Sequence, residues 1–190
     1  MQSVVNDIFF SVYQYFGFGL VFAIVSMLAL PEMKRLGIKS SLRQVWHCIR
    51  SSAEYKCRFF FFLYLFMVLS RTLICRNIWQ CPWENIIGEW GIFTSEGTFN
   101  TEGLLNIFLF FPLVYFGLRG FNQRDESNKW IVVNVIKASF SFSCMIEICQ
   151  LFLRLGTFQL SDIFQNTLGG FIGATIYIIR QKMKGREKLR

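Results

Sequence analysis

Apolar residues gather in five runs along this chain, and charged segments separate the runs. The runs lie at about residues 8–30, 59–79, 104–121, 130–153 and 163–180. Each has about the length of a helix that crosses roughly 30 Å of hydrocarbon at a rise of about 1.5 Å per residue. Arg71 interrupts the second run and Pro112 lies in the third. The pattern predicts an all-α fold, a polytopic membrane bundle of five transmembrane helices, in a single domain over residues 1–190.

The composition agrees with a membrane protein. The chain is 53% hydrophobic, 18% aromatic and 17% charged, whereas a soluble domain carries fewer apolar and more charged residues. The first run is not expected to be a cleaved signal peptide. The first ten residues contain no Lys or Arg, and no small-residue cleavage site follows the run. We expect a permanent membrane span there.

The basic residues are distributed unevenly between the segments that connect the runs. If the chain crosses the membrane at each run, sixteen of the 20 basic residues fall on one side. They are Lys34, Arg35, Lys39, Arg43, Arg50, Lys56, Arg58, Arg119, Arg124, Lys129, Arg180, Lys182, Lys184, Arg186, Lys188 and Arg190. The positive-inside rule then predicts an external N-terminus and a cytoplasmic C-terminus. Membrane lipids are therefore the expected partners of the net charge of +8, and not nucleic acid.

Two shorter patterns leave alternatives open. Segment 41–58 mixes apolar and basic residues, so it is either an amphipathic helix on the inner leaflet or an ordinary connector. Cys75 and Cys81 fall together at the outer end of the second run, where they could form a disulfide or remain free thiols. No Cys/His metal spacing is present, and the only histidine, His47, is expected on the cytoplasmic side. We expect no metal and no cofactor.

The most informative stretch places polar groups inside the fourth and fifth runs. Glu147, Gln150 and Arg154 fall within about 60° of one helical face, as do Asp162 and Asn166 one run later. A charge in a bilayer costs at least about 2.5–3.5 kcal/mol, so these groups must pair, face water or act on a ligand. The predicted topology places them in the outer third of the membrane.

The other runs bring polar groups to the same depth. Arg71 near the end of the second run and Asn106 near the start of the third complete the candidate binding set. Glu147 and Asp162 are the candidate catalytic carboxylates, and Arg71 or Arg154 is the candidate anion contact. Each has a structural alternative. Glu147 could pair with Arg71 to hold the bundle, and Asn106 could be interhelical hydrogen-bonding glue, as could Asn166.

The start of the fifth run has its own alternative. Asp162 could be the N-cap of that helix, with Gln165 completing a capping-box-like pair. Further along, Gly169, Gly170 and Gly173 predict close helix packing, and Gly169-x-x-x-Gly173 suits a neighbouring helix. We expect that neighbour to be the fourth run, because a short loop joins the two.

These residues resemble the VanZ-like family. The pattern is Glu-x-x-Gln, a short loop with Gly and Phe, and then Asp-x-x-x-Asn-Thr-Leu-Gly-x-x-x-Gly. It occupies Glu147, Gln150, Gly156, Phe158, Asp162, Asn166, Thr167, Leu168, Gly169 and Gly173, and Asn106 with 110–112 resembles an Asn-x-x-x-Phe-x-Pro element. The resemblance is strongest over residues 104–173. The chain departs from the family at Gln159 and Ser161, where further acidic residues are common.

The resemblance implies a protein of the bacterial cytoplasmic membrane and the cell envelope. The family's name-giving member is associated with resistance to the glycopeptide antibiotic teicoplanin. We therefore expect an outer-leaflet site that binds a headgroup, such as a lipid-linked wall precursor or a lipid-anchored antibiotic. The alternative is an intramembrane enzyme that acts on a lipid phosphate or sugar linkage through Glu147 and Asp162. A small transporter subunit is a third hypothesis, and the lack of paired broken helices argues against it.

Overall fold

The computed structural model describes residues 2–31, 38–74, 85–91, 101–121 and 126–187. These residues form helices and short connections and contain no strand. The α-helices are α1 (Gln2–Leu28), α2 (Ile38–Ser51), α3 (Ala53–Leu69), α4 (Thr101–Gly120), α5 (Asn128–Leu153) and α6 (Leu160–Glu187). A π-helical turn, η1 (Ser70–Ile74), continues α3. The all-α class predicted from the sequence is confirmed.

Three helical segments are long and apolar enough to cross a membrane. They are Ala53–Ile74, Gly103–Gly120 and Asn128–Leu153. The apolar part of α1 is the shorter Tyr13–Leu28, and α6 carries polar residues in its first half and basic residues at its end. Five spans therefore remain a prediction, as does the orientation of the termini.

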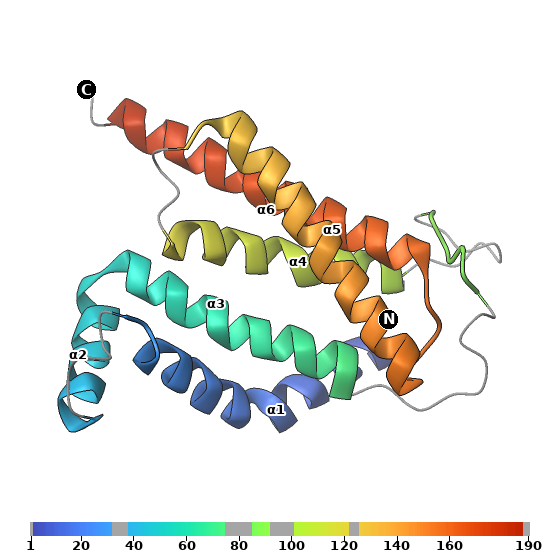
Figure 1. Ribbon diagram of the computed structural model, residues 1–190, viewed down its shortest axis with the longest axis horizontal. Coiled ribbons are helices and arrows are strands. Elements are labelled where there is room, and N and C mark those ends of the chain that lie inside the picture. Colours follow the sequence, from blue (N-terminus) through green and yellow to red (C-terminus); the bar gives the residue numbers. More distant parts are fainter. Residues whose placement is uncertain (1, 32–37, 75–84, 92–100, 122–125, 188–190) are drawn as a thin grey trace.

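Helices α3, α4 and α6 lie side by side, and α4 is the middle one (Figure 1). Helix α1 covers the outer side of α3, and α5 crosses α6 at an angle. Many large apolar side chains on these helices stay exposed, including Phe152, Phe140 and Phe171. Exposed apolar surface of this extent is typical of helices that contact lipid.

Helix α2 runs across the ends of α1 and α3 (Figure 1). It ends before Ser52, whose side chain accepts a hydrogen bond from the backbone N–H of Glu54 and so caps α3. The segment 41–58 expected from the sequence is thus divided between two helices. On α2, Val45 is buried against Met27 of α1, while Leu42 and Trp46 are exposed.

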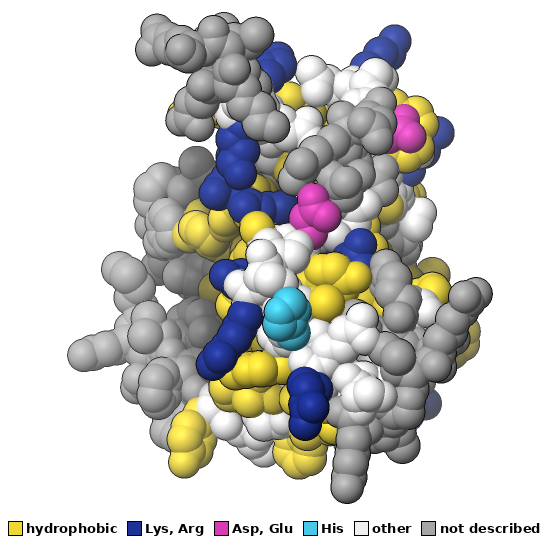
Figure 2. Space-filling view, turned by 90° about the vertical axis from the view of Figure 1, so that its left-hand side faces the viewer, with side chains coloured by type: hydrophobic (Ala, Val, Ile, Leu, Met, Phe, Trp, Pro, Cys, Tyr) yellow, Lys and Arg dark blue, Asp and Glu magenta, His cyan; other side chains and the backbone are white. Residues whose placement is uncertain are grey.

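Basic side chains gather at the end of the bundle formed by α2, the end of α4 and the end of α6. Figure 2 shows this face, on which Lys and Arg outnumber Asp and Glu among the described residues. The polar residues of interest lie toward the opposite end of the bundle, where η1 and the start of α4 are found (Figure 1).

Glycines set the distance between α4 and α6. A Cβ at Gly173 would lie 2.5 Å from the carbonyl oxygen of Phe111, and a Cβ at Gly169 would overlap the carbonyl oxygen of Ile107. The Gly-x-x-x-Gly face therefore packs on the backbone of α4. The expectation that its neighbour would be the fourth run, α5, is wrong for these two glycines. The adjacent Gly170 is the one that faces α5.

Candidate functional site

One face of α5 carries a buried polar stripe. Ser139, Ser143, Glu147 and Gln150 recur at intervals of three or four residues, and their side chains are between 0% and 4% exposed. The stripe faces inward, between α5 and its neighbours. A buried carboxylate such as that of Glu147 needs polar neighbours.

Two contacts fix how α5 and α6 lie against each other. The side-chain amide of Asn166 donates a hydrogen bond of 2.8 Å to the hydroxyl of Ser143. One turn away, a Cβ at Gly170 would overlap the hydroxyl of Ser139. Moving four residues forward along α6 thus moves the contact four residues backward along α5. The two helices are antiparallel in this register.

The same register continues one turn toward the loop that joins the two helices. There it places Asp162 of α6 opposite Glu147 of α5. Asp162 is 8% exposed and Glu147 is 1% exposed. The backbone N–H of Gln159 donates to Glu147 Oε2 at 3.0 Å, so the loop itself contacts this carboxylate. The two candidate catalytic carboxylates therefore share one level of the α5–α6 interface.

Gln150 connects α5 to the π turn. Its side-chain amide donates to the carbonyl oxygen of Thr72 at 2.9 Å, and Gln150 is 1% exposed. The hydroxyl of Thr72 donates back to the carbonyl oxygen of Val68 within the helix. The π turn thus presents a backbone carbonyl to α5, a use of such turns that is frequent near functional sites.

A second set of hydrogen bonds covers the start of α6. Asn106 of α4 donates to Gln165 Oε1 at 3.3 Å, and the amide of Gln165 donates to the carbonyl oxygen of Glu89 at 3.0 Å. The backbone N–H of Leu160 donates to the carbonyl oxygen of Ile86 at 2.9 Å. Segment 85–91 therefore lies over the first turns of α6, as Figure 1 shows.

These contacts test the N-cap alternative for Asp162. Helix α6 begins at Leu160, so Asp162 lies within the first turn and does not precede it. The side chain of Gln165 bonds to Asn106 and Glu89. The capping-box interpretation is therefore wrong: α6 begins at Leu160, two residues before Asp162, and the backbone N–H of Leu160 donates to the carbonyl oxygen of Ile86. A carboxylate in the first turn still interacts favourably with the helix dipole.

Buried acceptors without donors distinguish this site from ordinary packing. Gln150 Oε1 and Asn166 Oδ1 are buried and have no hydrogen-bond partner within the described part of the chain. The orientation of Gln150 is fixed, because the carbonyl of Thr72 requires an N–H donor. Buried acceptors of this kind are uncommon in native structures and call for an explanation such as a bound group or water.

The two arginines of the sequence-based set lie at the edges of the site. Arg154 ends α5 in a left-handed conformation (φ 54°) and is exposed, and Arg71 is half-buried in η1. The backbone N–H of Gln159 is one hydrogen-bond partner of the Glu147 carboxylate. Pairing with an arginine stays a prediction. Cys75 and Cys81 lie outside the described residues.

Sequence reasoning missed the serines. Ser139 and Ser143 precede Glu147 at intervals of four residues, so the spacing of small polar residues on one face was the available signal.

The described residues contain no group of three or more His, Cys, Asp or Glu side chains suited to a metal ion. The buried polar side chains of α5 and α6 are carboxylates, amides and hydroxyls.

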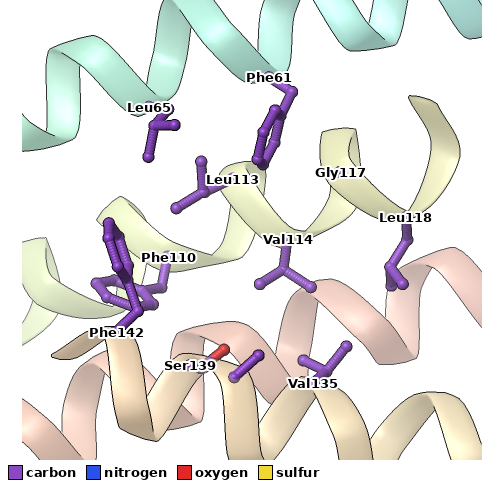
Figure 3. A pocket seen from close by; sticks show the side chains of 11 residues that line it. Phe61, Leu65, Phe110, Leu113, Val114, Gly117, Leu118, Val135, Ser139 and Phe142 are labelled. Carbon is purple, nitrogen blue, oxygen red and sulfur yellow. The ribbon is translucent and has the colours of Figure 1, made fainter. Parts of the chain in front are cut away.

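An apolar cavity of about 370 Å³ opens between α3, α4 and α5. Phe110 and Phe142 line one part of it, and Leu118 and Val135 line another (Figure 3). Phe142 is adjacent in sequence to Ser143 of the polar stripe. The polar stripe and the cavity share Ser139, which belongs to both. Ser139 is the one side chain with a polar group among those that line it.

Comparison with known proteins identifies relatives of the chain. It is 31% identical to Protein VanZ of Enterococcus faecium over 100 residues, which are 51% of this chain and 56% of that protein. The aligned region thus spans about half the length of this curated relative. No solved structure matches the chain. The profile of the VanZ/LLP1 family matches residues 20–181, and the chain belongs to this family.

Proposed function

We propose that this protein binds the polar headgroup of a lipid-linked ligand at the α5–α6 site. The observation that carries the proposal is the excess of buried hydrogen-bond acceptors. Gln150 Oε1 and Asn166 Oδ1 have no donor in the described residues, and Glu147 and Asp162 are buried on the same two helices. A headgroup rich in O–H and N–H donors, such as a sugar–peptide, complements such a surface.

The topology predicted from the basic residues indicates the side of the membrane on which the site lies. With five spans, an external N-terminus and a cytoplasmic C-terminus, the polar site lies in the outer leaflet and the basic end faces the cytoplasm. The ligand would then be a lipid-linked cell-wall precursor or a lipid-anchored glycopeptide such as teicoplanin. The adjacent apolar cavity supports a ligand with a hydrocarbon chain, because such a chain has no polar groups to leave unpaired.

An intramembrane enzyme is the second candidate function, and one observation favours it. The antiparallel register places Asp162 opposite Glu147, and paired carboxylates in a buried site commonly divide into a proton donor and a proton acceptor. Such a pair could act on a lipid phosphate or sugar linkage.

The test is binding of the purified full-length protein to a panel of lipid-linked precursors and glycopeptides. We expect one class to bind, and we expect Glu147→Gln to weaken its binding. A matched control is Glu126→Gln, which removes an exposed carboxylate outside the site. Chemical turnover of a bound precursor would favour the enzyme over the binding protein. No binding by any member of the panel would contradict the proposal.

A further inference from the structure

Two arginines from different helices meet on one phenol at the basic end of the bundle. Arg119 of α4 and Arg180 of α6 each donate a hydrogen bond from NH1 to the hydroxyl oxygen of Tyr115, at 3.0 Å and 2.7 Å. Because both guanidinium groups contact the same atom, they lie within a few ångströms of each other. Like charges this close repel, so the arrangement needs a compensating group.

The described residues supply little compensation. Tyr115 is the hydrogen-bond partner that the structure gives to both arginines, and no ion pair to either is recorded among those residues. Glu54 and Cys57 of α3 are near enough to interact electrostatically with Arg119. One carboxylate near two guanidinium groups leaves a net positive charge at this position.

Tyr115 adds a donor of its own, the hydroxyl O–H. Its oxygen already accepts two hydrogen bonds, and a phenol that accepts two still carries its own proton. The remaining N–H groups of each guanidinium form a fork that matches the oxygens of a phosphate. Three donor groups from two helices thus converge where the candidate span Gly103–Gly120 ends.

We propose that Tyr115, Arg119 and Arg180 form a binding site for a phosphate group, supplied by the headgroup of an anionic phospholipid. This site lies at the opposite end of the bundle from the α5–α6 site and does not depend on the proposed function. An arginine at the end of a membrane-spanning helix lies at the depth of the lipid headgroups, which favours a lipid over a soluble anion.

The test uses the full-length protein in neutral detergent micelles and measures bound phosphatidylglycerol by native mass spectrometry. We expect one tightly held lipid for the wild-type chain. Arg119→Gln combined with Arg180→Gln should weaken its binding about tenfold or more, because charge-assisted hydrogen bonds are lost. Tyr115→Phe should also weaken binding, although it changes no charge.

The control removes two positive charges from the same end of α6 outside the cluster. Lys182→Gln combined with Lys184→Gln should change the affinity less than about twofold, because exposed lysines contribute mainly long-range attraction. An equal loss in this control, or unchanged binding in both the arginine and the tyrosine variants, would overturn the proposal. Millimolar inorganic phosphate distinguishes the two sources: a lipid site resists displacement, whereas a site for soluble phosphate releases the lipid.

Discussion

Asn166 of α6 donates a 2.8 Å hydrogen bond to the hydroxyl of Ser143 on α5, and both side chains are buried. This bond lies between the glycine contacts of α6 and the level of the two carboxylates. It therefore fixes the register that brings Glu147 and Asp162 to one level. The small side chain of Ser143 thus helps to position the carboxylates of Glu147 and Asp162.

Ser143→Ala should destabilise the protein by about 0.6–2 kcal/mol, the range of interhelical hydrogen bonds in membrane proteins. The substitution leaves the amide of Asn166 buried with one fewer partner. Reversible unfolding in detergent would measure the change. Ser141→Ala is the matched control, because Ser141 is exposed on the same helix and its loss should have little effect.

Gly173→Ala should destabilise the contact between α4 and α6. A Cβ there would lie 2.5 Å from the carbonyl oxygen of Phe111, and overpacking of a close contact typically costs about 1–3 kcal/mol. Thermal unfolding in detergent would report the loss. Gly17→Ala provides the contrast, because a Cβ at Gly17 meets nothing within 4 Å and alanine favours the helix. Equal stability of the two variants would argue against the close approach of α4 and α6.

The sequence predicted the all-α class for a local physical reason, because long apolar runs favour helices. The repeat of polar residues every three or four positions also indicated the buried face that carries Glu147, Gln150, Asp162 and Asn166, whereas their role as a site stays a prediction. The packing partner of Gly169 was missed, because a short loop shows which helices are adjacent in sequence but not which backbone a glycine face contacts. The start of α6 was misplaced, because the helix begins at Leu160, whose backbone N–H donates to the carbonyl oxygen of Ile86, a residue distant in sequence.

The predicted topology can be tested by labelling single cysteines in an otherwise cysteine-free chain. A cysteine at position 96 should react with a membrane-impermeant reagent applied outside intact cells. A cysteine at position 184 should react only after the membrane is permeabilised. The expectation follows from the sixteen basic residues assigned to one side. Labelling of position 184 from outside would place the α5–α6 site in the inner leaflet and contradict the proposed ligands.

The decisive functional variants are Asp162→Asn and Glu147→Gln, which remove charge while conserving shape. Because Asp162 lies inside the first turn of α6, the lost interaction with the helix dipole should cost only about 0.3–1 kcal/mol of stability. If the carboxylates only support packing, both variants should express normally and leave glycopeptide susceptibility at the wild-type level.

If the carboxylates bind or transform a ligand, the same two variants should abolish any effect of the protein on teicoplanin susceptibility. Expression and thermal stability should stay near those of the wild type, which separates loss of function from loss of fold. Susceptibility would be compared in cells with equal amounts of each variant in the membrane. A wild-type phenotype in the double variant would exclude the carboxylates from function and leave the family relationship as a shared fold.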